Sequence, residues 1–74
     1  MRILLIEDDK VIGSAIREQL ESDGHSVDWA MRLDTASDAC AGAHFDLMLL
    51  DLMLPDGRGI PFLKSLRKSG NNVP

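Results

Sequence analysis

Two short apolar runs dominate the pattern of hydrophobic and polar positions along the chain. The first, Ile3–Ile6, lies within a strand predicted over Arg2–Ile6, and the second, Leu47–Leu50, lies within a strand predicted over Asp46–Asp51. Both runs are too short and too apolar for surface helices, and each indicates a strand that is buried on both faces. Both also lead directly into acidic residues, so the two strands would deliver carboxylates to one edge of a sheet.

A third stretch alternates instead of running continuously apolar. Val27, Trp29 and Met31 fall on one side of it, and Ser26, Asp28 and Ala30 fall on the other. This period of two predicts a strand over Ser26–Met31 that is less deeply buried and lies at the edge of the sheet.

Three further segments have helical periodicity. They run from Lys10 to a stop at Gly24, over Leu33–Gly42, and from Gly59, with Pro61 in the first turn, to Gly70–Asn72. Asp9 and Asp34 are the expected N-caps of the first two helices. The residues expected to face the core are Val11, Ile12, Ala15, Ile16 and Leu20 in the first helix, Thr35, Ala36, Ala39 and Cys40 in the second, and Ile60, Leu63 and Leu66 in the third.

The alternation of strands and helices predicts an α/β fold with a parallel sheet and right-handed crossovers. If the second strand lies outside the first and the third lies on its other side, the strand order is 2-1-3. The connection then reverses direction between the first and third strands, and open α/β sheets bind their ligands at such a gap. Glu7, Asp8 and Asp51 are the residues expected there.

Composition narrows the possible partners. The 74-residue chain has 12 acidic and 8 basic residues and a formal net charge of −4, which argues against nucleic-acid binding by this segment because phosphate backbones are held by clustered Lys and Arg. Cys40 is the only cysteine and is expected to be a small packing residue. Because the sequence shows neither a secretory signal pattern nor a membrane-length apolar run, we expect a cytoplasmic chain without membrane contact.

The expected meeting of Glu7, Asp8 and Asp51 has a chemical consequence. Three carboxylates within a few ångströms cannot all stay ionised in a partly buried crevice without a counter-charge. Magnesium can supply it, since Mg²⁺ takes oxygen ligands and keeps positions open for waters and phosphoryl oxygens. Asp8, Asp51 and a backbone carbonyl past Asp51 would make such a site, with Asp51 as a nucleophile toward phosphorus that becomes an aspartyl phosphate.

The two acidic strand ends together resemble a known family. Ile6-Glu7-Asp8-Asp9 and Leu50-Asp51-Leu52-Met53-Leu54-Pro55 are similar to the motifs of response-regulator receiver domains, and Pro55 and Gly59 match the family's turn after the phosphoacceptor. The motif variety is similar to that of regulators with a winged-helix (OmpR-type) DNA-binding domain. The resemblance implies a flavodoxin-like (CheY-like), doubly wound parallel sheet, and residues 1–74 would form the N-terminal part of a receiver domain, the first three of its five strand-helix units.

The resemblance also implies roles for individual residues. Asp51 would accept a phosphoryl group from the phosphohistidine of a sensor histidine kinase, with Glu7 and Asp8 as the acidic pocket. Asp8, Asp51 and the backbone carbonyl of Met53 would hold Mg²⁺. The output would be transcription control, with DNA bound only through an effector domain outside this chain. The family's switch Thr or Ser and its phosphoryl-contacting Lys belong to the fourth and fifth units.

Two positions depart from the family pattern. Asp56 stands where Gly is usual, and Arg58 stands where an acidic or small polar residue is usual. They add a carboxylate and a cation close to the expected site, so the entry into the third helix is expected to differ locally. The assignment of Asp51 as phosphoacceptor does not depend on either position.

Three other functions compete with phosphoacceptor signalling. A metal-dependent phosphohydrolase would also use Asp51 as nucleophile, but such enzymes tend to place a second Asp where this chain has Met53, so we do not expect an enzyme. A dinucleotide-binding domain needs a Gly-rich turn where the chain has Glu7-Asp8-Asp9. An interaction module without phosphate chemistry would form homo-oligomers through the third strand, whose apolar edge is expected to be unpaired.

Overall fold

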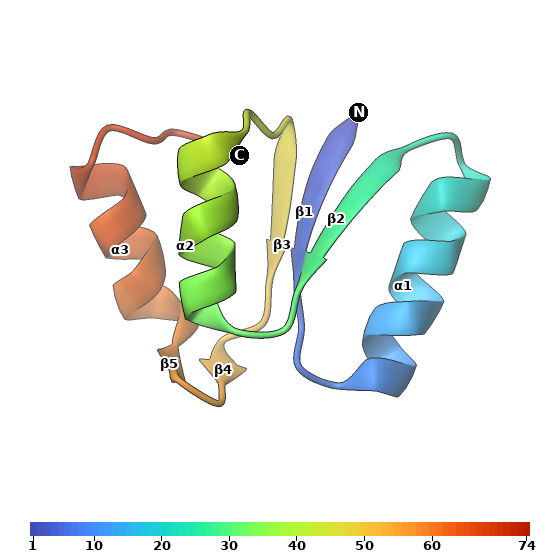
Figure 1. Cartoon of the computed structure of the whole chain (residues 1–74), viewed down its shortest axis with the longest axis horizontal. Coiled ribbons are helices and arrows are strands. Elements are labelled where there is room, and N and C mark those ends of the chain that lie inside the picture. Colours follow the sequence, from blue (N-terminus) through green and yellow to red (C-terminus); the bar gives the residue numbers. More distant parts are fainter.

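The computed structural model describes residues 1–74 as one parallel sheet with helices on both faces. The strands of the sheet are β1 (Arg2–Ile6), β2 (Ser26–Ala30) and β3 (Leu47–Leu50), and the helices are α1 (Lys10–Ser22), α2 (Leu33–Gly42) and α3 (Gly59–Lys68). Figure 1 shows α1 on one side of the sheet and α2 and α3 on the other. The strand order is β2-β1-β3 with both pairings parallel, so the predicted α/β fold and its 2-1-3 order are confirmed.

The centre of the molecule is β1. Its residues Ile3 to Ile6 are at most 2% exposed, because β2 and β3 pair along its two edges and helices cover both of its faces. Leu4 and Ile6 belong to a core cluster that also contains Ala36 of α2 and Phe45, with Phe62 and Leu66 of α3 packed against it. Since side chains alternate along a strand, Ile3 and Leu5 lie toward α1.

The two outer strands end where β1 ends. Ile6, the last residue of β1, is paired with Ala30 on one side and with Leu50 on the other, so β1 has no further residue to pair with Met31 or Asp51. For this reason β2 stops one residue before the predicted Met31, and β3 stops one residue before the predicted Asp51. β3 also begins at Leu47, one residue after the predicted Asp46. A strand without a pairing partner leaves the sheet, so the segments after β2 and β3 both turn away from it at the level of Ile6.

The prediction that β3 is buried on both faces is wrong. All of its residues are only half-buried, because it lies at the edge of the sheet and pairs with β1 alone. The prediction of an unpaired edge needs one correction. The Met48 backbone N–H donates a hydrogen bond to the Pro74 carbonyl at 2.9 Å, and the Val73 side chain enters the core. The end of the chain therefore covers the edge at Met48.

Helix α1 starts and ends as predicted but faces the sheet differently. The Asp9 carboxylate accepts hydrogen bonds from the N–H groups of Val11 and Ile12 at 2.9 and 3.0 Å, and Gly24 follows the helix with a φ of 90°. Val11 and Ile12 themselves are 81% and 50% exposed, so their predicted place in the core is wrong. Ala15 is exposed as well. The helix instead rests on the sheet through buried Gly13 and the predicted Ile16 and Leu20, which are half-buried.

In α2 the predicted bounds are confirmed, but the predicted N-cap is wrong. The cap position is Arg32, which makes no side-chain capping bond, and Asp34 lies inside the first turn. Ala36 is buried, and Ala39 and Cys40 pack against the core as predicted. Thr35 is exposed rather than inward, because the inner face follows the spacing of Ala36 and Cys40.

In α3 the predicted start at Gly59 is confirmed, and one predicted core residue is wrong. Ile60 is 46% exposed, whereas Phe62 and Leu66 pack against the core and Leu63 is half-buried. Gly59 is the first residue of α3 and is buried, and this contact sets the rotation of the helix about its axis. Residues three and seven positions later then lie on the same inward face. None of the helices combines the length and apolarity needed to cross a membrane.

A short hairpin that the sequence did not predict follows β3. Its strands β4 (Met53–Leu54) and β5 (Gly57–Arg58) pair antiparallel across the turn at Pro55-Asp56. The turn itself was indicated by the Pro-Asp-Gly sequence. In Figure 1 the hairpin lies beside the first turns of α2 and α3, at the same end of the sheet as the carboxyl ends of β1 and β3.

Candidate functional site

The three predicted acidic residues meet at the carboxyl edge of the sheet. Glu7 and Asp8 directly follow β1, and Asp51 directly follows β3, its parallel neighbour. The Asp51 backbone N–H donates to the Ile6 carbonyl at 3.0 Å, which fixes the two strand ends against each other. One carboxylate oxygen from each of the three residues lies within 4.8 Å of the others. The predicted juxtaposition is therefore present in the structure.

The negative charge of this cluster is not neutralised by the protein. None of the ion pairs of the structure includes Glu7, Asp8 or Asp51. Burial and the nearby Asp51 carboxylate raise the pKa of Glu7. Hydrogen bonding from the Met53 backbone N–H, followed by the neighbouring Glu7, lowers the pKa of Asp51. The cluster is thus a set of carboxylate oxygens with Asp51 held ionised, a donor set that fits a hard divalent cation.

The loop after Asp51 is held close to the start of α3. Asp51 Oδ1 accepts a hydrogen bond from the Met53 N–H at 3.3 Å, and the Gly59 N–H donates to the Leu52 carbonyl at 2.8 Å. A Cβ atom at Gly59 would lie 2.6 Å from the Asp51 carbonyl oxygen and 3.0 Å from the Leu52 Cα. Only glycine allows this approach, so Gly59 sets the path of the chain as it leaves the site.

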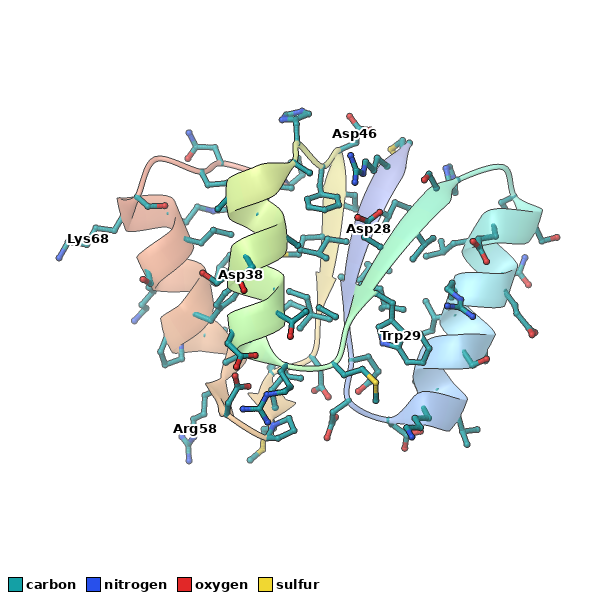
Figure 2. The ribbon with its side chains drawn as sticks, in the orientation of Figure 1. Asp28, Trp29, Asp38, Asp46, Arg58 and Lys68 are labelled. Atoms are coloured by element: carbon teal, nitrogen blue, oxygen red, sulfur yellow. The ribbon has the colours of Figure 1, made fainter.

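Trp29 supports the site in a way that sequence reasoning missed, since it was assigned only a packing place on an edge strand. Its indole N–H donates to the Glu7 carbonyl at 2.9 Å, and the Glu7 N–H donates to the Ala30 carbonyl at 3.0 Å. The ring lies between β2 and α1 (Figure 2), where a Cβ at Gly13 would come within 2.1 Å of it. A glycine in mid-helix is the signal that could have revealed this packing.

Asp56 is the second residue whose structural role sequence reasoning missed. Its carboxylate accepts hydrogen bonds from the N–H groups of Leu33 and Asp34 at 2.8 and 3.0 Å. It therefore caps α2 in place of the predicted Asp34, and the Leu33 N–H is the main cause of the lowered pKa of Asp56. A capping residue 23 positions away in sequence cannot be recognised from local pattern.

The sequence matches the family of response regulator receiver domains over residues 3–74. The chain belongs to this family. Among its curated relatives, the swarming motility regulation protein RssB of Serratia marcescens is 43% identical over 74 residues, and the response regulator protein PmrA of Pseudomonas aeruginosa is 40% identical over 74 residues. Each alignment covers all of this chain and 34% of the relative, so the chain spans about a third of the length of these proteins.

Solved receiver domains share the fold. The non-phosphorylated HemR receiver domain from Leptospira biflexa is 40% identical with a TM-score of 0.90, over 99% of this chain and 59% of that one. The receiver domain of the Francisella response regulator 1452 is 32% identical with a TM-score of 0.95, over 99% of this chain and 60% of that one. The predicted flavodoxin-like receiver fold is therefore confirmed, and the described units correspond to a little over half of such a domain.

Proposed function

We propose that this chain is the N-terminal part of a receiver domain that accepts a phosphoryl group on Asp51 in two-component signalling, with Glu7 and Asp8 as its acidic pocket. The observation that carries the proposal is the convergence of three carboxylates within 4.8 Å at the carboxyl edge of a parallel sheet, without a cationic partner. Membership in the receiver family supports it. The proposal makes the chain a phosphoacceptor rather than an enzyme with turnover.

In this proposal Asp8, Asp51 and the backbone carbonyl of Met53 hold Mg²⁺. The oxygen-only donor set and its uncompensated charge fit that ion. A related structure, the Thermotoga maritima response regulator TrrA, is 28% identical with a TM-score of 0.86 and was solved in complex with Mg²⁺ and BeF. When bound, Mg²⁺ supplies the positive charge that allows an anionic phosphoryl group to approach the cluster.

The residues of the chain then have distinct tasks in phosphoryl transfer. The Met53 N–H, 3.3 Å from Asp51 Oδ1, orients the nucleophilic carboxylate. An Asp51 oxygen forms the new P–O bond while the P–N bond of the donor phosphohistidine breaks, and the imidazole nitrogen leaves with the electron pair. The donor is a sensor histidine kinase in the cytoplasm, and transcription control follows through an effector domain that would bind DNA.

A Mg²⁺ titration tests the first requirement of this proposal. We expect the unsubstituted chain to bind Mg²⁺ in the millimolar range and Asp51→Asn to bind at least about tenfold more weakly, since loss of one carboxylate ligand removes both a bond and a charge. Asp38→Asn is the matched control, because Asp38 is an exposed carboxylate on α2 (Figure 2) and is not part of the acidic cluster. Equal binding by the chain and by Asp51→Asn would contradict the proposal.

The open edge of β3 favours a second candidate, an interaction fragment without phosphate chemistry. Leu47–Leu50 are only half-buried. Leu49 lines a groove with Leu5 of β1 and Ile16 of α1, and this groove also reaches Glu7 and Asp51. The Asp51 N–H points to β1, so the backbone of the preceding Leu50 points to the open edge. In this candidate a second copy of the chain pairs with that edge, and the chain associates whether or not Mg²⁺ is present.

A further inference from the structure

The contact between the β4–β5 hairpin and α2 is not explained by the acidic site itself. Asp56 lies in the turn of the hairpin, and its two carboxylate oxygens accept the N–H groups of Leu33 and Asp34 at 2.8 and 3.0 Å. These two N–H groups have no acceptor within the helix, because they belong to the first turn of α2. The cap position of the helix, Arg32, makes no side-chain capping bond to them. The Asp56 side chain is 17% exposed because it lies against the helix end, whereas the turn residue as a whole is exposed.

Three neighbouring contacts lie at the same junction. Arg32 Nη2 lies 3.6 Å from the Asp56 carboxylate, and Arg32 Nε lies 3.3 Å from that of Asp34. Gly57 has a φ of 154° and comes so close to Leu33 that a Cβ would lie 3.1 Å from its Cδ1 atom. The hairpin turn is thus fixed on α2 by hydrogen bonds, an ion pair and close packing.

This junction bears on the acidic site because the same hairpin carries Met53. Met53 is the first residue of β4 and is paired with Arg58 of β5. Each strand has only two residues, and a hairpin of this size has little stability of its own in water. Its position is set by its ends, at Met53 beside Asp51 and at Gly59 beside Leu52, and by the cap at its turn.

We propose that Asp56 is a positioning residue for the metal site. By capping α2 it fixes the hairpin, and through the hairpin it fixes the backbone of Met53 relative to Asp8 and Asp51. A glycine at this position would have no side chain to make the contact. This inference rests on the proposed function, because it concerns a ligand of the proposed Mg²⁺ site.

The test compares Asp56→Asn and Asp56→Gly with Asp38→Asn and the unsubstituted chain. Asn keeps one acceptor oxygen but turns an amide N–H₂ toward a backbone N–H, whereas Gly removes the contact altogether. We expect both variants to bind Mg²⁺ about tenfold more weakly, the lower end of what loss of a supporting partner costs a metal site. Amide hydrogen exchange should become faster at Leu33 and Asp34 in both variants, and Asp38→Asn should change neither quantity.

The outcomes separate the inference from the proposed function. If the unsubstituted chain binds no Mg²⁺, the proposed function fails and the inference fails with it. If that chain binds Mg²⁺ and both Asp56 variants bind it equally well although Leu33 and Asp34 exchange faster, Asp56 is only a helix cap and the inference alone is overturned. A loss of affinity that disappears at high salt is a long-range charge effect, and it also overturns the inference.

Discussion

At the scale of single residues, Glu7 and Asp51 share one site but hold protons differently. Asp51 accepts the Met53 N–H, which lowers its pKa, whereas partial burial and the charge of Asp51 raise the pKa of Glu7. A carboxyl whose pKa is raised in the folded state destabilises that state once it ionises, so the charge of Glu7 works against folding as the pH rises. The acidic cluster is therefore maintained at a cost in stability that a bound cation would remove.

Glu7→Gln tests this conflict between stability and binding. The substitution removes the repulsion with Asp51, so we expect the free energy of unfolding at neutral pH without metal to rise by up to about 1 kcal/mol, the range of partly exposed charge pairs. Mg²⁺ affinity should fall, because the pocket loses a charge. Urea denaturation and a Mg²⁺ titration measure the two quantities. A variant that is less stable than the original chain would contradict the assignment of repulsion at this site.

The positions of the acidic residues could be predicted from sequence because they depend only on where two strands end and on which strands are neighbours. Glu7 and Asp51 each follow an apolar run, and adjacent parallel strands bring their carboxyl ends to the same edge. Trp29 and Asp56 could not be placed in this way. Their hydrogen bonds reach backbone groups 22 and 23 residues away, and they depend on how a side chain is oriented between two packed elements.

At the scale of elements, glycines fix how the helices meet the sheet. Gly13 lets α1 approach Trp29, and Gly59 lets the start of α3 lie against the backbone of Asp51. These contacts explain why helical periodicity predicted the existence of α1 and α3 but not their exact faces. Val11 and Ile60 belong to apolar stripes, yet rotation about the glycine contacts leaves both exposed.

Gly59→Ala should destabilise the fold although alanine is the better helix former. Its Cβ would lie 2.6 Å from a backbone oxygen that cannot move without shifting the site, so we expect a loss of about 1–3 kcal/mol in the free energy of unfolding. Gly42→Ala is the matched control, because no atom lies within 4 Å of a Cβ at this last residue of α2. Chemical denaturation measures the free energy of unfolding of both variants. Equal losses of this free energy in Gly59→Ala and Gly42→Ala would contradict the packing role of Gly59.

At the scale of the whole molecule, the core is small and one-sided. Only 10 of 74 residues are buried, and most of the buried hydrophobic residues belong to the cluster on the α2 and α3 side. The α1 side keeps an open groove beside Leu49, and β3 has a pairing edge that only Pro74 meets. The contact of Pro74 with Met48 depends on the path of the last residues, so it could not be predicted from the sequence.

The open edge of β3 predicts association that depends on concentration. Sedimentation velocity should show dimers or larger species as the concentration of the chain is raised, and Leu49→Lys should shift the population toward monomer, since a charge on an exposed strand edge opposes pairing. Val11→Lys serves as the control, because Val11 is 81% exposed on α1. A chain that stays monomeric at all concentrations would contradict a role of this edge in association.

The intact mass of the chain after incubation with Mg²⁺ and acetyl phosphate is the most direct test of the proposed phosphoacceptor. We expect a single phosphoryl adduct on the unsubstituted chain, no adduct on Asp51→Asn, and an unchanged adduct on Asp46→Asn, which alters an exposed carboxylate at the opposite end of β3. An adduct of equal yield on Asp51→Asn, or no adduct on a chain that binds Mg²⁺, would contradict the assignment of Asp51 as phosphoacceptor.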